Sequence, residues 1–297
     1  MKKTNAPPGR PKKNKPISID NYKKVVSNPQ NEIAVNEIII SEASSFNNFL
    51  KTFKTLKATS LSIIFEETKF SIHALTSDKI QGGSKNKEIS LQIPGNSVFS
   101  YYCKKPTLIK LNSIVLLEPL ILEIDENSRY VTLFTTDMDN SLEYTIEDVQ
   151  NDIKSSSAIS TPPFDYNFNT LEYPTEIEEE IEFRIVGYKT SDIKKILGKK
   201  SRKNCNDCRL SALNNVVSIE YRNETDNVTE ITLNSKNSSR RIYGQENDKL
   251  YSIKFPESDI SQFLMYIKKD IEIIFSQDYI LMKSMEDGID IVYKINI

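Results

Sequence analysis

Three thiols and one imidazole are the side chains that could bind a metal or act as nucleophiles: Cys103, Cys205, Cys208 and His73. Cys205 and Cys208 form a CxxC pair, but a structural zinc site needs about four ligands. Only Cys103 and His73 could complete it, so we favour a thiol pair in a mobile loop, with zinc as the alternative. His73 falls in an alternating stretch typical of a strand, which favours a structural role. Since the chain also lacks a glycine-rich phosphate loop, we predict no enzyme, no metal and no cofactor.

Cations that could bind phosphate occur in the N-terminal stretch 1–16, which contains no acid. Within it, Pro8-Gly9-Arg10-Pro11-Lys12-Lys13 resembles an AT-hook, whose extended Gly-Arg-Pro core enters a narrow minor groove. The predicted DNA contacts of this stretch are Arg10, Lys12, Lys13 and Lys15. The alternative is a solubilising tail or a nuclear-localisation patch.

Further cations lie on two expected helices, at 45–57 and 190–200, where lysines stand opposite an apolar stripe. The predicted phosphate contacts are Lys51, Lys54 and Lys57 on the first helix and Lys194, Lys195 and Lys199 on the second, with Arg202 and Lys203 just beyond it. One such helix alone would indicate an ordinary solvated face. Two at equivalent places favour contact with phosphates, which carry charge but no base information.

The two helices are equivalent because the chain repeats its pattern. Leu50 and Ser71-Ile72 recur as Leu197 and Ser218-Ile219, an offset of about 147 positions. Solenoid repeats span only about 20 to 50 residues, so this period indicates two copies of one domain, with chance similarity as the alternative. We expect a disordered basic tail at 1–30, a first domain at 31–147, a connector at 148–180 and a second domain at 181–297.

Each half is expected to combine few helices with many antiparallel strands, which is an α+β class. A short helix should begin at Asn112 and stop at Pro119, because proline cannot continue the hydrogen-bond ladder. A strand is expected next, at 121–125. The stretch 148–180 shows no regular pattern and is typical of a linker or functional loop.

Length and composition limit the class of protein. A chain of 297 residues with 38% hydrophobic and 27% charged residues fits a soluble protein of about two domains. It has no apolar run that could span a membrane, no secretory signal and no disulfide framework, so we expect an intracellular protein. The net charge of −2 argues against a wholly basic nucleic-acid binder. Because the charge is segregated, a local basic face can still meet DNA.

Four segments carry a resemblance to a known family: 46–57, Glu66–Asp78, Leu111–Leu117 and Asp287–Ile295. Their order resembles that of the sliding clamps of the PCNA family, over roughly residues 33–297. By its length and its Gly-Arg-Pro-Lys-Lys tail, the chain is most similar to the clamps of African-swine-fever-like and related large DNA viruses.

The resemblance implies a polymerase processivity factor in DNA replication and repair. It implies a head-to-tail homotrimer of two-domain subunits, whose helices line a hole around double-stranded DNA and whose sheets lie outside. The partners would be DNA, a DNA polymerase, other replication or repair proteins and further copies of the chain, at a viral factory in the host cytoplasm or in the nucleus, with no membrane.

Subunits of such a ring join through edge strands, which we place at Tyr130–Thr135 and Val217–Arg222. The predicted interface residues are Tyr130, Val131, Leu133, Val217, Ile219 and Tyr221. The helix expected at 112–118 departs from the family because it carries no cation. The alternative function is a monomeric, non-encircling DNA-binding accessory protein or an AT-hook chromatin-type protein.

Overall fold

The structure is a computed structural model that describes residues 29–78, 85–148, 153–168, 181–198, 205–213, 216–223, 228–234, 241–244, 251–254, 257–276 and 278–296. The elements of its first half are β1 (Ala34–Ile40), α1 (Ala43–Thr55), β2 (Ser60–Phe65), β3 (Lys69–Asp78), β4 (Lys85–Pro94), η2 (Gly95–Ser97), β5 (Ser100–Cys103), β6 (Thr107–Leu111), η3 (Ile114–Leu117), α2 (Glu118–Glu123), β7 (Ser128–Thr136), β8 (Ser141–Asp148) and β9 (Ile153–Ser160).

The second half repeats the same order of strands and α-helices. Its elements are β10 (Ile181–Lys189), α3 (Thr190–Gly198), β11 (Cys205–Leu213), β12 (Val216–Asn223), β13 (Val228–Asn234), β14 (Arg241–Gly244), β15 (Tyr251–Lys254), α4 (Glu257–Leu264), β16 (Asp270–Ser276), β17 (Tyr279–Glu286) and β18 (Ile289–Asn296). Each half therefore places two α-helices among nine strands of the described chain.

The strands form antiparallel sheets of five, nine and four strands. The five-stranded sheet has the order β5-β1-β7-β8-β9, the nine-stranded sheet β14-β10-β16-β17-β18-β4-β3-β2-β6, and the four-stranded sheet β13-β12-β11-β15. The nine-stranded sheet crosses from one half to the other, because β18 pairs with β4 over Asp290↔Gln92 to Ile295↔Lys87. This pairing joins the last strand of the second half to the strands of the first half in one sheet.

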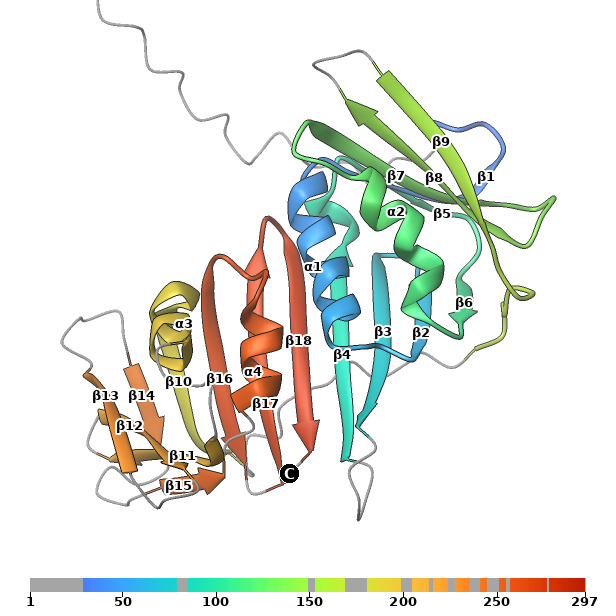
Figure 1. Ribbon diagram of the computed structural model, residues 1–297. Helices are drawn as coiled ribbons and strands as arrows, with labels where there is room; N and C mark the ends of the chain where they lie inside the picture. Colours follow the sequence, from blue (N-terminus) through green and yellow to red (C-terminus); the bar gives the residue numbers. More distant parts are fainter. Residues whose placement is uncertain are drawn as a thin grey trace, which may run out of the picture.

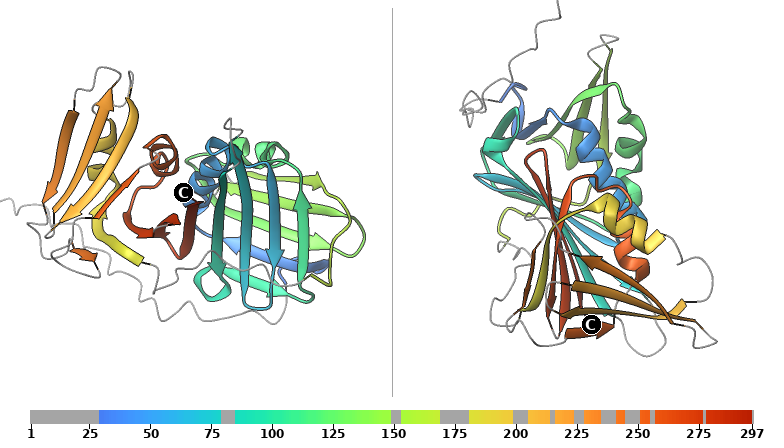
Figure 2. Two further views of the ribbon diagram at one scale, coloured as in Figure 1. Left: turned by 90° about the horizontal axis from the view of Figure 1, so that it is seen from below. Right: turned by 90° about the vertical axis from the view of Figure 1, so that its left-hand side faces the viewer.

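The four α-helices lie together on one side of the molecule, in front of the sheets in Figure 1 and gathered on one side in the right-hand view of Figure 2. The sequence of α1 explains how it packs: Phe46, Phe49, Leu50 and Phe53 recur at helical spacing, and all four are fully buried. Each such side chain contributes roughly 1.5–3 kcal/mol when buried. The apolar stripe thus fixes α1 on the sheet and leaves its polar face outward.

Three local predictions are wrong, and a fourth is wrong in part. Pro119 does not stop a helix but lies in the first turn of α2, where a missing N–H costs no intrahelical hydrogen bond. The strand expected at 121–125 is consequently helix up to Glu123. The CxxC pair lies in strand β11 and not in a loop. Strand β9 also occupies part of the stretch 148–180, which was expected to be a linker or loop.

Candidate nucleic-acid interface

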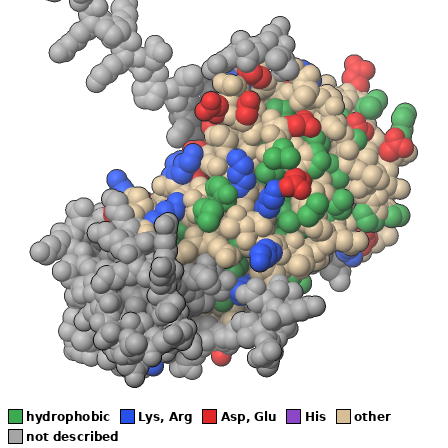
Figure 3. All heavy atoms as spheres, viewed as in Figure 1, with side chains coloured by type: hydrophobic (Ala, Val, Ile, Leu, Met, Phe, Trp, Pro, Cys, Tyr) green, Lys and Arg blue, Asp and Glu red, His purple; other side chains and the backbone are tan. Residues whose placement is uncertain are grey.

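The four α-helices form a continuous row in the order α2, α1, α4, α3, since each packs against the next. Figure 3 shows the same side of the molecule as Figure 1, with Lys and Arg side chains gathered over the middle of this face. Acidic side chains lie mainly toward the upper right in that view. We call the exposed side of the row the helix face.

The cations of the first half stand on and just after α1. Lys51 is half-buried, whereas Lys54 and Lys57 are exposed. Lys57 follows the helix in the left-handed region, with φ of 54°, and its N–H donates to the Lys54 carbonyl at 3.1 Å. Lys54 forms an ion pair with Glu118 of α2. The structure thus places the three predicted lysines on and just after α1, which lies inside the row between α2 and α4.

Lys194 of α3 is engaged inside the protein. Its Nζ donates to the carbonyl oxygens of Met265 at 3.0 Å and Ile267 at 2.9 Å, just after the end of α4. Burial lowers the pKa of this half-buried ammonium, and the nearby Glu286 carboxylate opposes that change. A cation at this place satisfies carbonyl groups that a helix end leaves without partners. Lys194 therefore has a structural role that the sequence did not indicate.

Two cations of the helix face were missed in the sequence. Lys268 and Lys269 follow α4 and are both exposed. Lys269 Nζ donates to Asp287 Oδ1 at 2.6 Å, and Ser45 of α1 donates to the other oxygen at 2.7 Å. Burial alone would raise the pKa of Asp287, but the bonds from Lys269 and Ser45 outweigh it and lower that pKa. The only sequence signal was an adjacent pair of lysines directly after an amphipathic helix.

The α2 end of the row is apolar and acidic. Val115, Leu116 and Leu122 are 61%, 41% and 72% exposed on η3 and α2. The segment 112–123 contains Glu118 and Glu123 and no Lys or Arg. Phosphate contact is therefore expected from α1 and the residues after α4, and not from α2.

The remaining predicted DNA contacts are not placed by the structure. Arg10, Lys12, Lys13, Lys15, Lys199, Arg202 and Lys203 lie outside the described residues. Lys195 belongs to α3, but its side chain is outside the described part of that helix.

The predicted edge strands are not edges. β7, which contains Tyr130–Thr135, pairs with β1 on one side and β8 on the other. β12, which contains Val217–Arg222, pairs with β11 and β13. Moreover, Val131 and Leu133 are buried in the core. The edge-strand assignment of Tyr130, Val131, Leu133, Val217, Ile219 and Tyr221 is therefore wrong, because strands paired on both sides have no free ladder groups.

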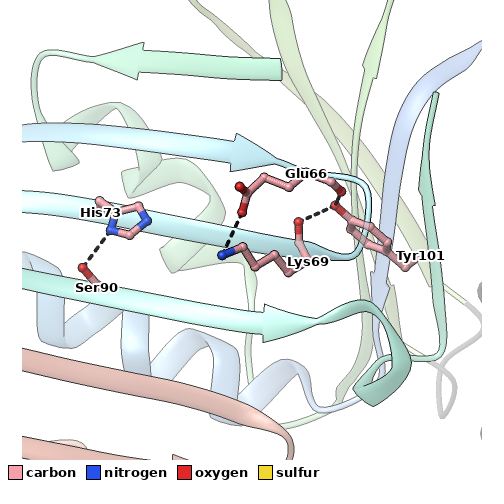
Figure 4. Close-up of polar contacts among 5 residues, drawn as sticks. All are labelled: Glu66, Lys69, His73, Ser90 and Tyr101. Atoms are coloured by element: carbon pink, nitrogen blue, oxygen red, sulfur yellow. Dashed lines mark hydrogen bonds and ion pairs between the residues drawn. The ribbon is translucent and has the colours of Figure 1, made fainter. Parts of the chain in front are cut away.

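His73 and Cys103, two of the side chains considered for chemistry, lie in structural surroundings, and Figure 4 shows His73 together with Tyr101 at the β2–β3 turn. His73 of β3 bonds through Nδ1 to Ser90 Oγ of β4 at 2.8 Å, and burial lowers its pKa to about 4. Tyr101 Oη donates to the carbonyl oxygens of Glu66 and Lys69 at 2.5 Å each, which closes the β2–β3 turn. Burial raises the pKa of the Cys103 thiol to about 12, so it is not an activated nucleophile.

The described residues contain neither a metal-binding cluster nor a membrane-spanning helix. No group of three or more His, Cys, Asp or Glu side chains among them could hold a metal ion. None of their helices is long and apolar enough to cross a membrane.

Comparisons with known proteins identify the fold. No protein-family model matches the chain, and no curated protein matches it in sequence. A crystal structure of proliferating cellular nuclear antigen from Entamoeba histolytica superposes with a TM-score of 0.69 at 13% sequence identity. The match covers 89% of this chain and 98% of that one. The predicted clamp fold, with its antiparallel sheets and few helices, is confirmed by this likeness.

Proposed function

We propose that the chain is a DNA sliding clamp that encircles duplex DNA and acts as a processivity factor for a DNA polymerase in replication and repair. The observation that carries the proposal is the helix face: a row of four helices with exposed cations in the middle, backed by sheets, on a clamp fold. Lysines arranged in this way suit weak, sequence-independent contact with phosphate.

The repeated order of elements supports a division into two tandem domains. On this proposal the helices line the hole of a ring, with a polymerase and other replication or repair proteins as partners. The site of action would be where DNA is copied, either the nucleus or a cytoplasmic viral factory. Arg10, Lys12, Lys13 and Lys15 would add contacts from the tail, so removal of residues 1–16 should weaken DNA binding and leave assembly intact.

The ring is proposed to close through β9 and β13. Within the described residues β9 pairs only with β8, and β13 only with β12. These strands have eight and seven residues, whereas the other edge strands have four or five. Long open edges favour pairing with another chain, and these two lie at opposite ends of the molecule (Figure 1). Head-to-tail pairing of β9 with β13 of the next copy would give the homotrimer.

Proline substitution in β9 tests this assembly. Successive N–H groups of a strand point to opposite sides, so either Ser156 or Ser157 presents its N–H to the open edge. Of the variants Ser156→Pro and Ser157→Pro, one should remain folded and have the 34.1 kDa mass of a monomer by light scattering. The unsubstituted chain should have three times that mass. A wild-type monomer at all concentrations, or a trimer in both variants, would refute the proposed ring.

Encirclement itself is tested on linear duplex DNA whose ends are blocked after the protein has bound. A ring should survive a high-salt wash on this DNA and be released when one end is cut. Release at the same rate from blocked and open DNA would instead support the monomeric accessory protein, since contacts made by charge alone are lost in salt.

A further inference from the structure

In each half of the chain, one lysine of the helix face has a carboxylate partner. Lys54 of α1 pairs with Glu118 of α2, 64 residues away in sequence. Lys269, after α4, pairs with Asp287 at 2.6 Å. All four side chains keep contact with solvent, at 45% and 37% exposure for the first pair and 51% and 32% for the second. Both ammonium groups can therefore be reached by another anion.

The neighbouring lysines of the same face differ. Lys51, Lys57 and Lys268 form no ion pair with another residue of the described chain. The helix face thus combines lysines that are free to meet an anion with lysines whose charge is already matched.

Asp287 is held in place for its partner. It occupies the left-handed region with φ of 54° and is followed by Gly288 with φ of 80°. Ser45 of α1 fixes one carboxylate oxygen at 2.7 Å, which orients the other toward Lys269. The hydrogen bond with Asp287 raises the pKa of Lys269, so both groups stay charged at neutral pH.

We infer that Glu118 and Asp287 compete with DNA phosphates for Lys54 and Lys269, so that DNA binds these two lysines only by exchanging one anion for another. The inference rests on the proposed function. An exchange of partners gains less than a new contact, because the ion pair within the protein must first break. DNA releases cations when its phosphate binds the lysine, but the displaced carboxylate takes up cations from the salt, so the net release of counterions is small. The two carboxylates thereby keep contact weak where the protein would slide.

Neutral isosteres of the carboxylates test the exchange. In Glu118→Gln and in Asp287→Asn, affinity for a linear duplex should rise about 1.5- to 5-fold, the range expected from the strength of surface ion pairs. The slope of log K against log salt should steepen by about 0.9 for each freed lysine. Asparagine tolerates the left-handed region and can still accept from Ser45, so the turn should persist.

Two controls separate exchange from a general effect of charge. Asp165→Asn removes one negative charge from a similar exposed pair, 3.9 Å from Lys110 Nζ of strand β6 and on no helix of the row, and should change neither quantity. In the double variant Lys54→Ala with Glu118→Gln, the gain should disappear, because the competing ammonium is gone.

The outcomes also separate this inference from the proposed function. If the wild type binds DNA with a salt-dependent affinity but Glu118→Gln and Asp287→Asn bind no more tightly, the exchange is refuted and the clamp proposal stands. An equal gain in Asp165→Asn would likewise refute it. If neither the wild type nor any variant binds duplex DNA at low salt, the proposed function itself fails.

Discussion

Lys194 offers a test of whether position in the sequence or contact in the structure decides the role of a helical lysine. Sequence alone places it beside Lys195 as a phosphate contact, whereas the structure gives its ammonium two carbonyl partners at 3.0 and 2.9 Å. We therefore expect Lys194→Met, which keeps the aliphatic stem, to destabilise the protein and to leave DNA binding unchanged. The matched variant Lys51→Met should do the reverse.

The magnitude follows from the two hydrogen bonds. A hydrogen bond from a charged group contributes roughly 1.5–3 kcal/mol, and a cation near the end of a helix adds about 0.3–1 kcal/mol. Burial of the ammonium offsets part of this gain, as the lowered pKa of Lys194 indicates. We expect Lys194→Met to lower the free energy of unfolding by about 1–2 kcal/mol, and Lys51→Met to change it by less than about 0.5 kcal/mol.

Two measurements on each variant are sufficient. Urea unfolding followed by circular dichroism gives the change in stability, and fluorescence anisotropy of a labelled duplex at several salt concentrations gives the slope of log K. Lys51→Met should reduce that slope by about 0.9, and Lys194→Met should not change it. A Lys194→Met protein of normal stability with a reduced slope would refute the capping role and restore the phosphate contact.

Three further predictions concern the framework of the fold. His73 is the only histidine, so NMR of the untagged protein should show a single imidazole titrating near pH 4. Because the unfolded chain takes up this proton near pH 6.5, the free energy of unfolding should fall by about 3 kcal/mol between pH 7 and 4. The variant His73→Asn should lack this pH-dependent loss of stability. Glu37 is 1% exposed and accepts from the backbone N–H groups of Gln30 and Asn31. Glu37→Gln should therefore lower the free energy of unfolding by about 1–2 kcal/mol and speed amide exchange at those two residues. Gly288→Ala should cost about 2 kcal/mol or more in urea unfolding, because φ is 80° and a new Cβ would lie 2.8 Å from Ser97 Cβ; an unchanged midpoint would contradict the strain.

Sequence periodicity was sufficient to predict a helix that packs against the core through its own apolar stripe. The stripe of Phe46, Phe49, Leu50 and Phe53 predicts a helix at 45–57, and α1 spans Ala43–Thr55. The same reasoning predicts a helix at 190–200, and α3 spans Thr190–Gly198. These helices are visible in sequence because an amphipathic helix records its buried face in residues three and four apart.

Relations between distant segments could not be obtained in this way. Whether β7 or β9 is the edge of a sheet depends on pairing with strands elsewhere in the chain, and β7 has the same alternating pattern on either assumption. The partners of the lysines are equally remote, since Glu118 lies 64 residues from Lys54 and Met265 lies 71 residues from Lys194. Spacing identifies cations on a helix, but only the fold decides which of them are already bound.

A clamp with few free cations would hold DNA by a different means from a protein that binds by charge alone. In the described part of the helix row, two lysines have carboxylate partners and Lys194 binds carbonyl groups. Among the lysine side chains that the structure describes on and beside this row, Lys51, Lys57 and Lys268 remain for phosphate. These three contacts would add only about 2.7 to the salt slope per subunit, so contact through the described part of the helix row would be weak and would exchange rapidly.

In the proposed closed ring, retention would not depend on that affinity, because DNA without a free end could leave only when a pairing between β9 and β13 opened. Weak inner contacts and firm edge pairing are thus complementary: the first permits movement along DNA and the second prevents departure from it. The two can be separated by experiment. The folded, monomeric proline variant of β9 should lose retention on end-blocked DNA and keep the salt slope per subunit, whereas Lys51→Met should lower the slope and leave retention on blocked DNA intact.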